Sequence, residues 1–205
     1  MNTAIARRAL AALCFFLVCA AVHAEDVLRN IQSQLVLEPV IRGEFTQTRK
    51  LAQIKKTLVS RGRFLVAQNY GVIWKQVSPM TQTTRLTGDE IVQTDGQVTL
   101  MKVSADQEPV LKIVNGVLFA VFSGDLAALA QHFDYSGNVE NNGWRIRFTP
   151  RDANLARLIG ELRLTGGRDI SSIEMESAAG DLTRIEFSAL THDQTLSGEE
   201  KKRFE

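Results

Sequence analysis

A long run of period-two alternation in the first half of the chain restricts the folds that are open to it. Ile41, Gly43 and Phe45 alternate with polar neighbours, and successive side chains of a strand point to opposite faces of a sheet. Further strand-like segments follow at Leu58–Ala67, Gly71–Val77, Gln82–Thr87, Ile91–Thr94 and Val98–Val103, with turn residues between them. Short connections of this kind join antiparallel neighbours. The sequence therefore predicts an antiparallel meander.

Strand-like segments return in the second half of the chain. They are predicted at Asp134–Glu140, Trp144–Thr149, Glu161–Thr165, Ser172–Ser177 and Leu182–Leu190. Neither an internal repeat nor a change in composition divides the chain, so a single domain is expected over residues 25–205. A sheet of about ten or eleven strands curls towards a barrel. The predicted fold is mainly β: an incomplete antiparallel β-barrel with helices that cover its concave face.

Two longer segments have the spacing of helices rather than of strands. Glu25–Leu37 has its apolar residues on one helical face and ends before Pro39. Val110–Phe122 is apolar almost all round, which is typical of a helix that is buried on most sides. The following "DLAALAQHF" predicts a second, short helix. In the charged tail "SGEEKKRFE", Ser197 and Glu200 have the spacing of a capping box.

The apolar segment Val110–Phe122 has two interpretations. It is either the core helix of a curled sheet or one wall of a cavity for a hydrophobic ligand. In the second case the lining residues are Phe45, Phe64, Val66, Trp74 and Leu86 from the strands, and Ile113, Val117, Phe119 and Val121 from the helix. A side-chain pattern is the same for a filled core and for an empty one, so both interpretations stay open at this point.

The first 24 residues resemble a secretory signal peptide rather than a part of the fold. Arg7 and Arg8 precede a short apolar run, and Val22-His23-Ala24 has the small residues of a cleavage site. Cys14 and Cys19 both lie in this segment, neither of them in the context of a lipidation site. We therefore expect Sec export, a soluble periplasmic chain that starts near Glu25, and no disulfide bond.

The expected mature chain offers little for catalysis. Its two histidines, His132 and His192, are sixty positions apart, and neither has a metal-binding or nucleophilic partner at a recognisable spacing. No glycine-rich loop suited to phosphate is present. Without Arg7 and Arg8 the formal charge changes from +1 to −1, which argues against a nucleic-acid binder. We expect a protein that is not an enzyme and that has neither a cofactor nor a metal.

Positive charge gathers in one segment of the chain. Its cations are Arg42, Arg49, Lys50, Lys55, Lys56, Arg61 and Arg63, against the single acidic residue Glu44. One interpretation is the solvated face of strands and a loop. The other is a docking surface for an acidic partner or for anionic lipid headgroups, because clustered charge raises encounter rates.

The order of these segments resembles the periplasmic outer-membrane lipoprotein carriers, the LolA family, over nearly all of the expected mature chain. "GEFTQTR" places Phe45-Thr46-Gln47 at the family's F-x-Q strand, and "SRGRFLV" places Gly62 and Phe64 at its G-x-aromatic strand. Trp74 and "VSP" close the next strand, "TDGQVTLM" resembles a hairpin of the family, and "GDLTRIEFSAL" resembles its penultimate strands. Residues 118–152 further resemble LolA-like proteins associated with lipid and aryl-polyene export.

The resemblance implies a monomeric carrier whose helices form a lid over a hydrophobic cavity. The cavity would shield the acyl chains of a lipoprotein or of a related lipophilic cargo between an inner-membrane exporter and an outer-membrane acceptor. Where the family has a basic residue that holds the lid shut, this sequence has Gln68, which can still bond helix carbonyls. This departure favours a carrier of a non-lipoprotein lipid or polyene. A lipoprotein-sensing module is a further alternative.

Overall fold

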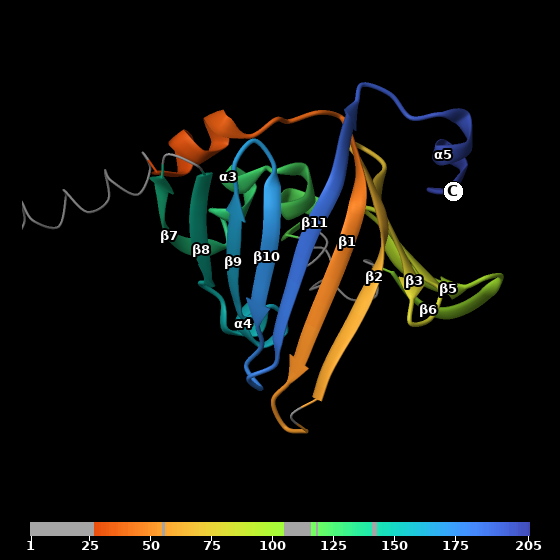
Figure 1. Ribbon diagram of the computed structural model, residues 1–205, viewed down its shortest axis with the longest axis horizontal. Coiled ribbons are helices and arrows are strands. Elements are labelled where there is room, and N and C mark those ends of the chain that lie inside the picture. Colours follow the sequence, from red (N-terminus) through yellow and green to blue (C-terminus); the bar gives the residue numbers. More distant parts are fainter. Residues whose placement is uncertain (1–26, 55, 105–115, 118, 141–142) are drawn as a thin grey trace, which may run out of the picture.

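The computed structural model describes residues 27–54, 56–104, 116–117, 119–140 and 143–205 (Figure 1). The strands are β1 (Val40–Leu51), β2 (Lys56–Ala67), β3 (Gly71–Ser78), β4 (Gln82–Leu86), β5 (Glu90–Asp95), β6 (Val98–Ser104), β7 (Phe133–Glu140), β8 (Gly143–Pro150), β9 (Glu161–Gly166), β10 (Ile170–Glu176) and β11 (Leu182–Asp193). The helices are α3 (Leu126–Leu129), α4 (Ala153–Leu158) and α5 (Gly198–Lys202). Residues 27–34 and, apart from 118, residues 116–123 are also helical.

All eleven strands belong to one antiparallel sheet, in the order β6-β5-β4-β3-β2-β1-β11-β10-β9-β8-β7. Strands that follow one another in the sequence are paired within β1 to β6 and within β7 to β11. The first strand, β1, also pairs with the last, β11, which places Phe45 opposite Phe187. The sheet stays open, because β6 and β7 form its two edges. The predicted fold, an incomplete antiparallel barrel with covering helices, is confirmed.

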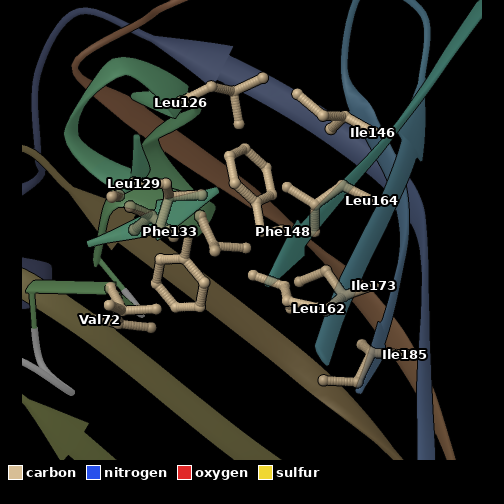
Figure 2. Packing of buried hydrophobic residues seen from close by; sticks show 14 of the residues in the cluster. Val72, Leu126, Leu129, Phe133, Ile146, Phe148, Leu162, Leu164, Ile173 and Ile185 are labelled. Atoms are coloured by element: carbon tan, nitrogen blue, oxygen red, sulfur yellow. The ribbon is translucent and has the colours of Figure 1, made fainter. Parts of the chain in front are cut away.

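Alternation along the strands directs apolar side chains to the concave face of the sheet. In β8, Trp144, Ile146 and Phe148 are buried, and the charged residues between them are exposed. Leu126 and Leu129 of α3 pack onto the same core. Figure 2 shows Ile146, Phe148, Leu126 and Leu129, together with labelled side chains of β9 to β11, pointing into one cluster. The helices therefore close the concave face with apolar contacts.

Some element boundaries differ from the prediction. The opening helix covers residues 27–34 rather than continuing to Leu37, and β2 begins two residues earlier than expected, at Lys56. The second half of the predicted apolar helix is helical. Its first half, including Ile113, lies outside the described residues, as does the predicted signal peptide.

A second apolar cluster lies on the opposite, convex face of β1 to β3. Leu65 and Ile73 are buried there against Leu196 and Phe204 from the C-terminal segment. This packing explains why β2 and β3 carry apolar residues on both faces: the concave side meets the helices, and the convex side is covered by the chain's own C-terminal segment. The sequence analysis described that segment only as a charged tail, because its two apolar side chains are separated by seven mostly polar residues.

An ion pair fastens α5 to β1. The Arg42 guanidinium donates to Glu200 through Nε (2.6 Å to Oε1) and Nη2 (2.7 Å to Oε2), and through Nη1 to Asp193 (2.6 Å). The predicted capping box of Ser197 and Glu200 is confirmed. Hydrogen bonds from Arg42, reinforced by those from Ser197, lower the pKa of Glu200 from its ordinary value of 4.5 to about 2.

Glu200→Gln is expected to lower the free energy of unfolding by about 2 kcal/mol at pH 7, because the two-pronged, charge-assisted pair is lost. A carboxylate with a depressed pKa contributes stability above its unfolded pKa and loses it as the pH falls. The difference between wild type and variant should therefore be full above pH 4.5 and vanish towards pH 2. Urea unfolding across this pH range measures it. Glu199→Gln, on an exposed position of the same helix, is the matched control; a difference that persists at pH 2 would contradict the assignment.

Candidate functional site

Two glycine–phenylalanine pairs lie in the middle of the concave face, one with its phenylalanine on β1 and the other with its phenylalanine on β2. In the β1–β2 ladder Phe45 stands opposite Gly62, and Gly43 stands opposite Phe64. A Cβ atom on Gly62 would lie 2.7 Å from two Phe45 ring carbons, and one on Gly43 would lie 2.8 and 2.9 Å from the Phe64 ring. Each ring therefore occupies space that any larger residue opposite it would fill. This is a close approach that only glycine permits.

Four aromatic rings on neighbouring strands form a continuous surface, which we call the ring wall: Phe45, Phe64, Trp74 and Phe187. Phe45 stacks on Trp74 with ring centroids 3.7 Å apart, and Phe64 meets Phe187 at 5.1 Å. Sequence analysis selected the first three. It missed Phe187 because only the pairing of β1 with β11, which no local pattern reveals, brings that ring to the others.

One ring from the helix at residues 116–123 enters this wall. The Phe122 ring lies 5.5 Å from Trp74, 6.0 Å from Phe187 and 6.2 Å from Phe64, centroid to centroid. Sequence analysis named other residues of this helix, and the structure places Val117 and Val121 in the core and Phe119 half-buried beside it. Phe122 was missed because the segment is apolar almost all round, so periodicity favours no single face.

The remaining predicted lining residues lie further along the same concave face. Val66 and Leu86 both flank Val72 in neighbouring strands and are buried in the main core. Ile113 is outside the described residues. The predicted strand residues and the described helix residues thus lie in one apolar cluster.

A small cavity lies between the ring wall and the helix at residues 116–123. Its volume is about 40 Å³, and it is lined by residues that include Ile41, Val121, Phe122 and Leu190. It has room for a few water molecules. A groove of about 450 Å³ lies beside Gly116, between Tyr70, Leu86 and Phe119. Among the described residues, side chains of the helix thus reach into the concave face, and a larger groove lies next to them.

The side chain of Gln32 links the covering helices to one another. Gln32 Nε2 donates to the carbonyl of Gly124 (3.0 Å), and its Oε1 accepts from the backbone N–H of Leu126 (3.1 Å). Gln32 therefore ties the helix at residues 27–34 to the turn between the helix at 116–123 and α3. The Gln68 side chain is exposed and makes no hydrogen bond within the described part of the chain. Sequence analysis missed Gln32 because it is an ordinary polar position of an amphipathic helix.

Gln32→Met is expected to loosen this link, because it keeps the side-chain length and removes both hydrogen bonds, worth about 1–2 kcal/mol together. Amide hydrogen exchange of residues 119–129 should become about tenfold faster. Ser33→Ala is the matched control, since Ser33 bonds only within its own helix. Equal exchange in the two variants would show that Gln32 does not hold the helices.

The residues of the predicted basic surface fall into two groups, those with acidic partners and those without one among the described residues. Arg42 is engaged with α5, and Arg49 pairs with Asp181 at 3.0 Å. Lys50, Lys56 and Arg61 are exposed with no carboxylate partner among the described residues, and Arg63 lies 3.5 Å from Glu44. Lys55 is outside the described residues. The free cations therefore gather on the β1–β2 hairpin.

Neither histidine lies in a cluster of catalytic type. His192 Nε2 lies 2.7 Å from Asp169, and His132 is exposed. Within the described ranges, no three His, Cys, Asp or Glu side chains are grouped as metal ligands. No helix of the described residues has the length and apolar character needed to cross a membrane.

Comparison with known proteins gives a family match over most of the chain. A family model described as outer membrane lipoprotein carrier protein LolA-like matches residues 18–199. No curated protein is similar enough in sequence to match.

Several solved structures are similar to the chain. A LolA superfamily protein from Nitrosomonas europaea is 11% identical, with 86% of this chain and 96% of that chain covered and a TM-score of 0.45. In the Pseudomonas aeruginosa MucA/MucB complex, the matching chain is 16% identical, with 87% and 60% covered and a TM-score of 0.47. A putative outer membrane lipoprotein-sorting protein domain from Vibrio parahaemolyticus is 8% identical, with 88% and 97% covered and a TM-score of 0.45.

Proposed function

Because the chain belongs to the LolA-like family of outer membrane lipoprotein carriers, we propose that it is a periplasmic carrier of acylated cargo. Family membership supports a carrier-like role in general. The finer proposal is that the concave site binds the acyl chains of a lipoprotein or of a related lipid and shields them from water between the inner and the outer membrane. The role is one of binding rather than catalysis.

The insertion of Phe122 into the ring wall is the observation that carries this proposal. The ring meets three aromatic side chains of the wall, and an acyl chain can replace such apolar contacts without leaving a polar group unsatisfied. A bound chain would gain about 0.8 kcal/mol for each buried methylene. The same contacts that close the free protein are thus available to the cargo.

Competition between the helix and the cargo sets the net affinity. A long acyl chain in a permanently open cavity would bind too tightly to be released. When Phe122 occupies the site in the free protein, cargo must displace its ring from the wall and break the Gln32 hydrogen bonds. The free energy of these lost contacts is subtracted from the free energy of cargo binding. An inner-membrane exporter that favours the open state would promote loading, and an outer-membrane acceptor that favours the closed state would promote release.

The proposal covers a chemical class of cargo, molecules with long apolar chains, rather than one compound. The apolar wall suits acyl chains of a lipoprotein, and it also suits a non-lipoprotein lipid or a polyene. A module that senses lipoproteins would use the same wall without delivering cargo. Carriers and sensors differ in whether bound lipid passes to membranes.

Mass spectrometry of organic extracts tests the proposal. Protein purified from the periplasm of its native cells is expected to carry an acylated or polyene species, and to transfer it to outer-membrane vesicles. Extracts without such a species, combined with hydrolytic turnover of a lipid substrate, would overturn it. Retention of the bound lipid in the presence of every membrane fraction would favour the sensing module.

A further inference from the structure

Three hairpin turns lie at the same end of their strands, along a border of the sheet that runs across the strands and is distinct from the edge strands β6 and β7. Because β1 to β6 form a meander, the β1–β2, β3–β4 and β5–β6 turns share one edge, and the β2–β3 and β4–β5 turns share the other. In Figure 1 the β1–β2 turn is the lowest point of the ribbon, and the β5–β6 turn projects furthest to the right. We call this edge, with its residues 50–54, 56–61, 75–82 and 93–101, the three-turn edge.

The three most exposed large apolar side chains of the described residues lie one at each of these turns. Ile54 is 63% exposed, Met80 62% and Val98 63%. Five more exposed apolar residues belong to the same three hairpins: Leu58, Val59, Val77, Leu100 and Met101. At the opposite edge, Tyr70 packs its ring against Phe204 at 5.6 Å. Exposed apolar surface is therefore concentrated on one edge.

Hydrogen bonds fix two of the turns in place. Asp181 accepts from the backbone N–H of Ala52 (3.1 Å) and from Arg49 (3.0 Å), which anchors the β1–β2 turn beside Ile54. Gln76 Nε2 donates to the carbonyl of Met80 (3.1 Å) and anchors the β3–β4 turn. The apolar side chains are therefore presented outward from ordered turns.

The three-turn edge is also positively charged. No aspartate or glutamate stands between Glu44 and Asp89 in the sequence, and the exposed Lys50, Lys56, Arg61 and Lys75 have no carboxylate partner within the described ranges. Other strands of the sheet differ: the convex side of β9 to β11 has its cations paired, for example Arg163 and Arg184 with Glu174. Within the three ranges Asp95 is the one acidic residue, and the neighbouring Asp181 of the β10–β11 turn is paired with Arg49.

We propose that the three-turn edge seats the protein on an anionic membrane surface. Ile54, Met80 and Val98 enter the headgroup region, and the unpaired cations bind the lipid phosphates. Single apolar residues on separate turns match a fluid surface that accepts a side chain at any point, whereas a folded acidic partner would need a matching pocket for each. Weak apolar and electrostatic contacts of this kind sum to reversible binding. The inference rests on the proposed carrier function, to which it adds the membrane-facing edge.

Vesicle co-sedimentation tests the proposal. The full sequence is expressed in cells, and the protein isolated from them is used. We expect binding to phosphatidylcholine vesicles that contain phosphatidylglycerol, and little binding to phosphatidylcholine alone. The triple variant Ile54→Ser/Met80→Ser/Val98→Ser should bind about tenfold more weakly. Lys50→Glu/Lys56→Glu should bind at least about twentyfold more weakly, since each cation contributes about fivefold.

Matched controls use residues away from the edge. Leu37→Ser/Val139→Ser removes two other exposed apolar side chains, and Lys201→Glu/Lys202→Glu reverses two charges on α5. Both variants should bind vesicles as the wild type does. Equal loss in the edge and control variants, or no binding to anionic vesicles, would overturn the proposal. So would binding that appears only with an added acidic membrane protein.

A separate measurement distinguishes this proposal from the carrier function. Uptake of a fluorescent fatty acid in solution should be unchanged in the edge variants, because none of the altered residues belongs to the ring wall. If uptake is absent in the wild type while vesicle binding behaves as expected, the carrier function fails and the membrane-facing edge stands.

Discussion

Phe122→Ala is expected to tighten the binding of a fatty acid by about thirtyfold. The closed state loses the contacts of one half-buried aromatic ring, worth about 2 kcal/mol, whereas a loaded state with the ring displaced loses little. Since 1.4 kcal/mol is a factor of ten, the dissociation constant should fall by about that thirtyfold. The fluorescence of Trp74, which lies 5.5 Å from the Phe122 ring, reports the binding, and urea unfolding should show a less stable free protein.

Phe204→Ala is the matched control for this experiment. It removes the same side chain from the convex cluster, outside the concave apolar cluster that contains the ring wall. We expect a change in affinity of less than about threefold. If Phe122→Ala weakens binding or leaves it unchanged while the protein remains folded, Phe122 is not the group that competes with cargo.

Gly62→Ala is expected to be strongly destabilising, because the added methyl group has no room in the sheet. Its Cβ would lie 2.1 Å from the carbonyl oxygen of Lys75 and 2.7 Å from the Phe45 ring. The first neighbour is backbone of a paired strand, so β2 and β3 must separate or shift. We expect a loss of about 4 kcal/mol and a melting temperature lower by about 10 °C, measured by thermal unfolding.

Gly88→Ala is the control, because no atom lies within 4 Å of its Cβ position. Its effect should stay within about 0.5 kcal/mol. If Gly62→Ala were as stable as Gly88→Ala, the β2–β3 ladder and the ring packing above it could not be as tight as described. The pair of variants thus tests the wall without any ligand.

Local pattern was sufficient to locate the strands of this protein. Alternation and turn residues are properties of short segments, and they placed the β2–β3 hairpin and the hairpins of the second half within about two residues. Helix length was less predictable, because the opening helix ends at residue 34 although apolar spacing continues through Leu35 and Val36. There Val36 donates its N–H to the carbonyl of Arg168 instead. That contact depends on the tertiary fold.

The site was predictable where residues lie in adjacent strands and unpredictable where distant segments meet. Phe45, Phe64 and Trp74 follow from alternation in consecutive strands. Phe187 needs the β1–β11 pairing, and Phe122 needs the seating of a helix that has no distinct polar face. Whether the predicted residues bind lipid stays a prediction.

The predicted closure at Gln68 came from alignment with a family pattern rather than from a physical constraint. The structure leaves that side chain exposed and engages Gln32 with the turn at Gly124 and Leu126. A glutamine in a helix is equally compatible with solvent and with a pair of backbone bonds. Only the position of the facing turn decides between them.

The pairing of β1 with β11 has a consequence for biogenesis. A chain made from its N-terminal end completes β1 first. The strand that pairs with the second side of β1 is β11, the last of the eleven to be synthesised, which places Phe187 opposite Phe45. Until then the centre of the future sheet presents an unpaired strand edge, which invites association with other chains. A chain truncated before Leu182 would keep both meanders and lack the seam between them, so it should aggregate rather than survive as a smaller protein. Synthesis of β11 is therefore the step that allows the two halves of the sheet to join.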